Sequence, residues 1–123
     1  MPRTNVSGNS PYEGSIGFSR AVRVGSAVYV SGTVATAADG SVAGVGDPYA
    51  QAVQTLRNIE AALQNAGASL ANVVRTRMYG ADLPNGDAVP RARGDFFGAV
   101  PPASTMVEVP RLIDPAMLVE IEA

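Results

Sequence analysis

The sequence contains no cysteine, histidine, lysine or tryptophan. Without cysteine the chain has no disulfide, no thiolate nucleophile, and no cysteine-based zinc or iron–sulfur site. Without histidine it lacks the usual general base near neutral pH and the commonest metal ligand. Without lysine it cannot form a Schiff base with a carbonyl substrate or with pyridoxal phosphate. Chemistry is left to Asp, Glu, Tyr, Ser, Thr, Arg and backbone groups, and we expect neither a metal nor a cofactor.

A large excess of either charge and long apolar runs are also absent from the sequence. The net charge is −2 at pH 7, which is too close to neutral to favour binding to nucleic acid or to an anionic membrane. No apolar run approaches the roughly 18 residues of a membrane span. The first residues, "MPRTNVSGNSPYEG", lack the apolar segment of a secretory signal. We therefore expect a cytoplasmic protein without nucleic-acid or membrane partners.

The length and the patterning that are present predict one α+β domain over residues 1–123. Gly25-Ser26 separates two β-rich stretches and predicts a hairpin over 21–24 and 27–31. Asp47 and Pro48 suit the N-cap and first position of a helix, and Gly67 suits its end. The rest of the pattern predicts a short strand near 3–6, strands at 73–79, 106–109 and 118–123, a turn at 83–87 and a second helix over 88–97.

The resulting order β-β-α-β-α-β-β predicts a sandwich of one sheet with two helices on one face. Two helices leave the other face of the sheet uncovered. Because the strands alternate apolar and polar residues, that face is partly apolar and should meet another subunit. The pattern therefore predicts a closed homo-oligomer.

A few polar residues stand out as candidates for chemistry. Glu120 lies in the middle of the last strand, where a desolvated carboxylate could act as a base or orient a water molecule. A solvated outer strand face is the alternative, and periodicity alone favours it. Ser31-Gly32 exposes backbone N–H groups or forms a plain turn. Arg93 binds an anion or is a solvated helical arginine, and Arg75 and Arg77 offset the glutamates of neighbouring strands.

Several blocks of the chain resemble the Rid family, the reactive intermediate deaminases also called YjgF proteins. They are "VYVSGTVA" at 28–35, "QAVQTLRNIEAALQNAGASLANVVRTRMY" at 51–79, "DFFG" at 95–98, and "PPASTMVEVPRL" with "LVEIEA" at the end. The resemblance implies a chorismate-mutase-like fold and a homotrimer with a small-molecule cleft at each subunit boundary. It also implies hydrolysis of enamines and imines to 2-keto acids and ammonia.

The resemblance assigns residues to that cleft. Glu120, Ser31 and Gly32 match the family pattern, with Glu120 holding the attacking water. The arginine of a "PARS" motif, whose guanidinium would pair with a substrate carboxylate, is Ser104 here. An aromatic Tyr of the family corresponds to Phe18. The residues that we expect to bind substrate are Phe18, Ser31, Gly32, Arg93, Ser104, Thr105 and Met106. Arg93 is included on the hypothesis that it reaches the cleft from the second helix of a neighbouring subunit.

These matches and departures predict a diverged Rid-family enzyme acting on a small imine, enamine or related carbonyl compound. Loss of a bidentate arginine contact should cost about 2 to 5 kcal/mol in binding of a carboxylate. We therefore expect the standard hydrolysis of 2-aminoacrylate to be poor. The alternative is a non-catalytic trimer that binds a metabolite or a protein through the same clefts. An endoribonuclease fits poorly, because phosphodiester binding requires clustered cations.

Overall fold

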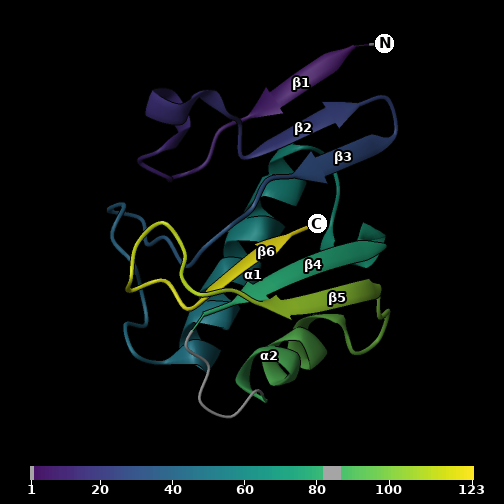
Figure 1. The fold of residues 1–123 in the computed structure, drawn as a ribbon. Helices are drawn as coiled ribbons and strands as arrows, with labels where there is room; N and C mark the ends of the chain where they lie inside the picture. Colours follow the sequence, from purple (N-terminus) through teal and green to yellow (C-terminus); the bar gives the residue numbers. More distant parts are fainter. Residues whose placement is uncertain (1, 82–86) are drawn as a thin grey trace.

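A computed structural model describes residues 2–81 and 87–123 of the protein (Figure 1). The elements, in chain order, are β1 Arg3–Val6, the π-helical turn η1 Glu13–Gly17, β2 Ala21–Val24, β3 Ala27–Val30, α1 Pro48–Asn65, the 3-10 turn η2 Leu70–Asn72, β4 Arg75–Gly80, α2 Ala88–Phe97, β5 Ala103–Glu108 and β6 Val119–Glu122. This order confirms the expected α+β class. The turn expected at 83–87 lies, except for Asp87, outside the described residues.

The long helix α1 begins and ends where the sequence predicts. The Asp47 side chain accepts a hydrogen bond from the backbone N–H of Ala50 at 3.0 Å, as an N-cap should. Gly67 adopts the left-handed backbone (φ 81°) that ends a helix most easily at glycine. The apolar stripe faces the core, and Leu56 and Ile59 are fully buried.

The second helix, α2, also has the expected bounds and packs against α1. Its buried residues Val89, Ala92 and Phe97 lie on the side that joins the core. No helix within the described residues has the length and hydropathy that a membrane-spanning segment requires.

The strands form two three-stranded ladders, in the orders β1-β2-β3 and β5-β4-β6. β4 is parallel to β5 and antiparallel to β6. The sequence predicted one continuous sheet, and the difference arises at Ser31 and Gly32. The backbone N–H of Val30 donates to Ala123, and the N–H of Thr33 donates to Ile121, both at 2.8 Å.

Ser31 and Gly32 therefore lie opposite a single residue of β6, Glu122. This is a β-bulge, which interrupts pairing and bends the strand that contains the extra residue. Ser31-Gly32 is consequently not a plain turn. It is the point at which the N-terminal ladder joins β6, and it brings the backbone of one ladder against side chains of the other.

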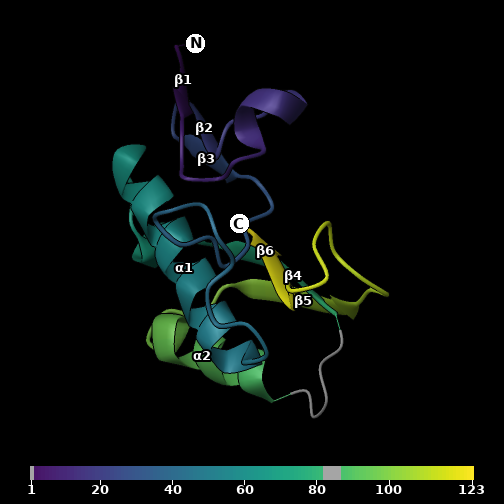
Figure 2. The same ribbon diagram turned by 90° about the vertical axis from the view of Figure 1, so that its left-hand side faces the viewer.

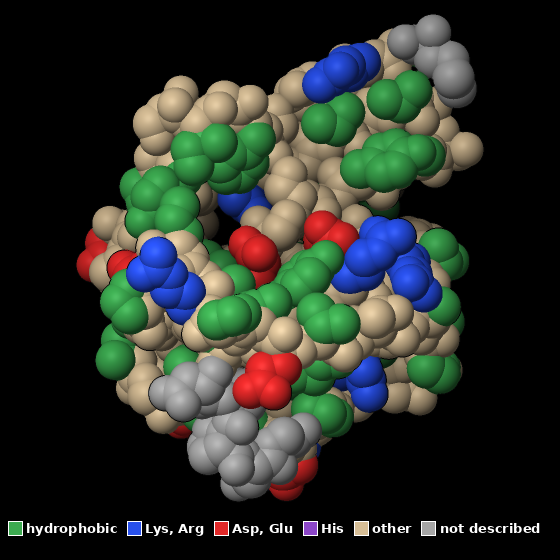
Figure 3. All heavy atoms as spheres, viewed as in Figure 1, with side chains coloured by type: hydrophobic (Ala, Val, Ile, Leu, Met, Phe, Trp, Pro, Cys, Tyr) green, Lys and Arg blue, Asp and Glu red, His purple; other side chains and the backbone are tan. Residues whose placement is uncertain are grey.

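Both helices lie on the same side of the β5-β4-β6 ladder, as expected (Figure 2). The opposite face carries no helix in the part of the chain that the structure describes. Figure 3 views this helix-free face and shows hydrophobic side chains beside acidic and arginine side chains, around a hollow between the two ladders. Tyr29 and Val107 are among the exposed large hydrophobic residues of the chain.

Candidate functional site

Glu120 lies on β6, opposite Tyr79 of β4, and its side chain is half-buried. Burial raises the pKa of Glu120 above the ordinary glutamate value, because a carboxylate loses hydration there. The neighbouring Glu122 raises the pKa further, and Arg20 lowers it. Glu120 is therefore a carboxyl group in a partly desolvated place next to one cation, rather than a residue of a solvated strand face.

The backbone of Gly32 lies directly against this carboxyl group. A Cβ atom at residue 32 would lie 2.9 Å from both Cδ and Oε1 of Glu120, closer than side chains tolerate. Glycine is thus needed so that the carboxyl group can lie against the backbone of the bulge. Gly32 and Glu120, which the resemblance assigns to the same cleft, lie in contact.

Arg20 is the main residue of this site that the sequence analysis missed. It is only 7% exposed, and its Nη1 donates to the carbonyl oxygen of Gly32 at 2.6 Å and to Oγ1 of Thr33 at 2.9 Å. Its Nε lies 4.0 Å from Oε2 of Glu13. Burial lowers the pKa of Arg20, while Glu13 and Glu120 raise it. Arg20 fixes the carbonyl of the bulge and places a positive charge near Glu120.

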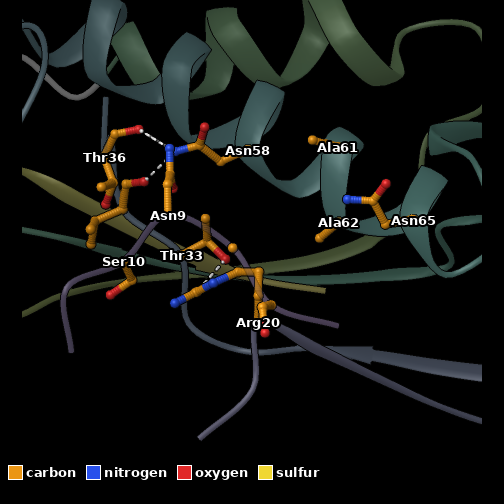
Figure 4. Close-up of a pocket in the computed structure, with 12 residues that line it drawn as sticks. Asn9, Ser10, Arg20, Thr33, Thr36, Asn58, Ala61, Ala62 and Asn65 are labelled. Carbon is orange, nitrogen blue, oxygen red and sulfur yellow. Dashed lines mark hydrogen bonds between the residues drawn. The ribbon is translucent and has the colours of Figure 1, made fainter. Parts of the chain in front are cut away.

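A cavity of about 280 Å³ lies between Arg20 and helix α1. Figure 4 shows Arg20 and Thr33 on one side of it and Asn58, Ala62 and Asn65 of α1 on the other. Asn58 donates to the carbonyl oxygens of Val34 and Thr36. Its amide is thus occupied in holding the segment after the bulge against α1, which keeps Thr33 in place for Arg20.

Phe18 and Ser31 lie at the edges of the same site. The Arg20 guanidinium carbon is 5.1 Å from the centre of the Phe18 ring, a cation–π distance. The Ser31 hydroxyl donates to the carbonyl of Ser19 at 2.7 Å, and its N–H donates to the carbonyl of Arg20. Both donors of Ser31 are therefore used inside the chain. We call Phe18, Arg20, Ser31, Gly32 and Glu120 the Glu120 cluster.

A second group of candidates surrounds Ser104 on β5. The Ser104 oxygen accepts hydrogen bonds from Oγ1 of Thr76 at 2.9 Å and from Nη1 of Arg93 at 3.1 Å. Arg93 comes from α2 and is half-buried, so it is not the solvated helical arginine that the pattern alone favours. Arg93, Pro102 and Ser104 line a cavity of about 280 Å³. We call Thr76, Arg93 and Ser104 the Ser104 cluster.

The two residues after Ser104 divide between the faces of the sheet, because strand side chains alternate. Met106 is partly buried against the core. Thr105 is exposed, and its hydroxyl accepts a hydrogen bond from Nη2 of Arg75 at 3.1 Å. Within one chain, the Ser104 and Thr105 hydroxyls therefore do not point into a common site.

The two clusters also lie on opposite faces of the β5-β4-β6 ladder. Ser104 pairs with Thr76 of β4, whereas Glu120 pairs with Tyr79 of the same strand. Positions 76 and 79 differ by three, an odd number, so their side chains point to opposite faces of the sheet. One chain thus holds both clusters without bringing them together.

The strand arginines behave partly as expected. Nη1 of Arg77 lies 3.5 Å from Oε1 of Glu122, its cross-strand neighbour, which confirms the expected offset of a strand glutamate. The Tyr79 hydroxyl donates to the same carboxylate at 3.2 Å. Glu122 is thereby paired with a cation and a hydroxyl donor from β4.

The fold and its sites define the class: an α+β protein with a helix-backed sheet, a bulge-held carboxyl group and an open sheet face. Comparisons with known proteins then give the family. The family profile described as "Endoribonuclease L-PSP" matches residues 9–123. The chain belongs to this family, which is also named Rid, YjgF or RutC, as the resemblance predicted.

Three relatives illustrate the similarity. The crystal structure of Rv2704 from Mycobacterium tuberculosis shares 45% sequence identity, with a TM-score of 0.87 over 98% of this chain and 96% of that one. The YjgF gene product of E. coli shares 31% identity, with a TM-score of 0.82 over 97% and 94% of the chains. A RutC family protein of Pyrococcus abyssi shares 34% identity over 86% of this chain and 83% of that protein.

Proposed function

We propose that the protein is a diverged Rid-family enzyme that acts on a small imine, enamine or related carbonyl metabolite by water addition or proton transfer. The observation that carries the proposal is Glu120, a half-buried carboxyl group with a raised pKa, held against Gly32 beside the buried Arg20. A raised pKa makes a carboxylate a stronger acceptor of protons from water and substrate.

In the hydrolysis of a protonated imine, the Glu120 carboxylate accepts a proton as a water oxygen bonds to the imine carbon, which gives a neutral amino alcohol. Glu120 then returns this proton to the nitrogen, and the carbon–nitrogen bond breaks to release ammonia. The hydroxyl proton passes to the Glu120 carboxylate as the carbonyl forms, and ammonia takes it up to leave the site as ammonium. The reaction needs no other reactant than water, and Arg20 limits the cost of the negative charge on Glu120.

The active unit that we propose is a homotrimer with its clefts between subunits. The helix-free face and its exposed hydrophobic residues support an interface there. The opposite orientations of the two clusters also support it, because one subunit could then supply Glu120 and its neighbour Ser104. The bounds 1–123 of the single domain, the cytoplasmic location and the absence of nucleic-acid and membrane partners stay predictions.

The substrate differs from that of a standard 2-aminoacrylate deaminase in this proposal. Position 104 carries a hydroxyl group instead of a guanidinium, so a carboxylate would lose the fork-shaped contact that arginine makes. The family name "Endoribonuclease" does not extend to this chain in our proposal. The chain has no histidine and a net charge of −2, which suits neither phosphodiester cleavage nor phosphate binding.

The test is a turnover screen with small imines, enamines and carbonyl compounds, comparing the native protein with Glu120→Gln. We expect saturable product formation that falls at least about a hundredfold in the variant, the range general acid–base catalysis contributes. Glu108→Gln is the matched control, because Glu108 is an exposed strand glutamate, and it should keep full activity. Equal activity of Glu120→Gln and the native protein would refute the proposal.

The second candidate is a non-catalytic trimer that binds a metabolite or a protein partner in the same clefts. Ser104 favours it, because the neutral residue removes the group expected to anchor the substrate. This candidate predicts no turnover of any compound in the screen. It also predicts ligand binding that survives Glu120→Ala, measured by chemical-shift titration.

A further inference from the structure

The Ser104 cluster has more hydrogen-bond donors than acceptors. Ser104 has one hydroxyl proton, and its oxygen already accepts from Thr76 and Arg93. Thr76 is completely buried, so its hydroxyl proton is directed to Ser104. The proton of Ser104 is left to donate outward, since a hydroxyl group carries one donor and two acceptor positions.

Arg93 has no acidic partner within residues 2–81 and 87–123. In this part of the chain, the ion pairs are those of Arg20 with Glu13 and of Arg77 with Glu122. The Ser104 oxygen is the hydrogen-bond acceptor that these residues offer to Arg93. A half-buried guanidinium thus uses Nη1 for a neutral hydroxyl and leaves Nε and Nη2 without an acceptor among the described residues.

Arg93 and Ser104 line the 280 Å³ cavity between the end of α2 and the start of β5. Pro101 and Pro102 form part of its wall and contribute no backbone N–H, so the positive charge and the hydroxyl dominate its donor chemistry. A cavity of this volume accommodates a ligand of a few non-hydrogen atoms.

We propose that Arg93 and Ser104 form an anion-binding subsite for a small monocarboxylate. The inference deepens the proposed function, on which it rests for the identity of the site, by adding a carboxylate to the substrate class. The edge formed by Nε and Nη2 of Arg93 matches the two oxygens of a carboxylate. The Ser104 hydroxyl supplies a further donor to one of them.

The subsite does not restore the standard chemistry. The guanidinium projects from α2 instead of from β5, so a carboxylate bound to it is held from a different backbone position. The carbon that undergoes attack is then displaced from the place where 2-aminoacrylate would react. A carboxylate substrate and poor turnover of 2-aminoacrylate are therefore expected together.

The test measures binding directly, by chemical-shift titration of the full-length protein with propanoate and with its uncharged counterpart propanamide. We expect propanoate to bind at least tenfold more tightly than propanamide. Arg93→Gln should remove this preference, and Arg93→Lys should retain part of it, because lysine keeps the charge but not the fork. Arg57→Gln is the matched control, since Arg57 is exposed on α1 and its loss changes the net charge equally.

Thermal unfolding of each variant shows whether it remains folded at the titration temperature. If Arg93→Gln does not remain folded, Arg93→Lys takes its place in the titration. An unchanged preference for propanoate in a folded Arg93→Gln would overturn the subsite, as would tighter binding of inorganic phosphate than of propanoate. Neither result depends on turnover. Loss of turnover in Glu120→Gln with Arg93-dependent binding intact supports both proposals, whereas Arg93-dependent binding without any turnover refutes only the enzymatic one.

Discussion

The Glu120 cluster and the Ser104 cluster are built in different ways although they share strand β4 as a neighbour. Glu120 lies against a bulge, and its surroundings come from residues 18–33, far away in the sequence. Ser104 lies on the opposite face, where a buried threonine and a helical arginine hold its oxygen. The first cluster presents a carboxyl group that can exchange a proton. The second presents donors that can hold a negative charge.

The difference teaches how an α+β chain of this size can divide a site. A base and an anion anchor on one sheet face of one chain would attract and neutralise each other, as Arg77 and Glu122 do. On opposite faces, the Glu120 carboxyl group and the Arg93 guanidinium do not pair within one chain, and the trimer that we propose would bring them together between subunits. The division of labour in turn makes each cluster separately testable.

The largest effect is expected from Gly32→Ala, which acts on the Glu120 cluster alone. The added Cβ would lie 2.9 Å from the Glu120 carboxyl group, and this flexible end must move away. Displacement of a catalytic group by about 1 Å can cost on the order of a hundredfold in rate. We expect a loss of that size in kcat with binding of propanoate unchanged.

The control for this variant is Gly14→Ala, since a Cβ at residue 14 meets nothing within 4 Å. It should behave like the native protein in turnover and in thermal unfolding. Full activity of Gly32→Ala would contradict the role given to the contact between the bulge and Glu120.

An intermediate effect is expected from mixing subunits of two variants. This experiment tests whether the Glu120 cluster of one subunit meets the Ser104 cluster of its neighbour. Glu120→Gln and Arg93→Gln damage different clusters, so a cleft between subunits can combine one intact half from each variant. In randomly mixed trimers about a quarter of the clefts should be intact, as follows from independent choice of the two neighbours in a closed ring. Co-expression with two affinity tags and turnover of the purified mixture measures the recovery.

Each variant alone provides the baseline for this experiment. A mixture no more active than the two variants apart, or a protein that sediments as a stable monomer at micromolar concentration, would show that the clusters do not meet between subunits.

The smallest effect concerns the pH dependence of stability. Because the pKa of Glu120 is raised in the folded state, the folded protein binds this proton more tightly than the unfolded chain does. The stabilising contribution is complete below the unfolded glutamate pKa of about 4.3 and is lost as pH rises through the raised value. The free energy of unfolding should therefore fall with pH over this window. The fall should be small, because solvent screens a half-exposed carboxyl group.

Glu120→Gln removes the titrating group and should flatten this part of the profile, whereas the exposed Glu108→Gln should leave it as in the native protein. Urea unfolding between about pH 4 and pH 7 measures the difference. Parallel profiles for the native protein and Glu120→Gln would mean that Glu120 is hydrated like an ordinary surface glutamate.

Local patterns predicted the elements well, because the residues that set each boundary act on their own neighbours. Asp47, Pro48 and Gly67 bound α1, and Gly25-Ser26 joins β2 to β3. The same kind of reasoning failed for the single sheet. The bulge at Ser31-Gly32 forms only when the segment is paired with β6, at the other end of the chain.

The sequence by itself determined the chemistry that is available: carboxylates, hydroxyls and guanidiniums, with no histidine, cysteine or lysine. It also placed Glu120 in mid-strand and put a neutral residue at position 104. Only the tertiary structure decided which groups meet. The burial of Arg20 beneath the bulge and the reach of Arg93 to Ser104 depend on distant backbone segments packing together. Periodicity within one strand or helix carries no information about such contacts, because it specifies a face and not the partner that covers it.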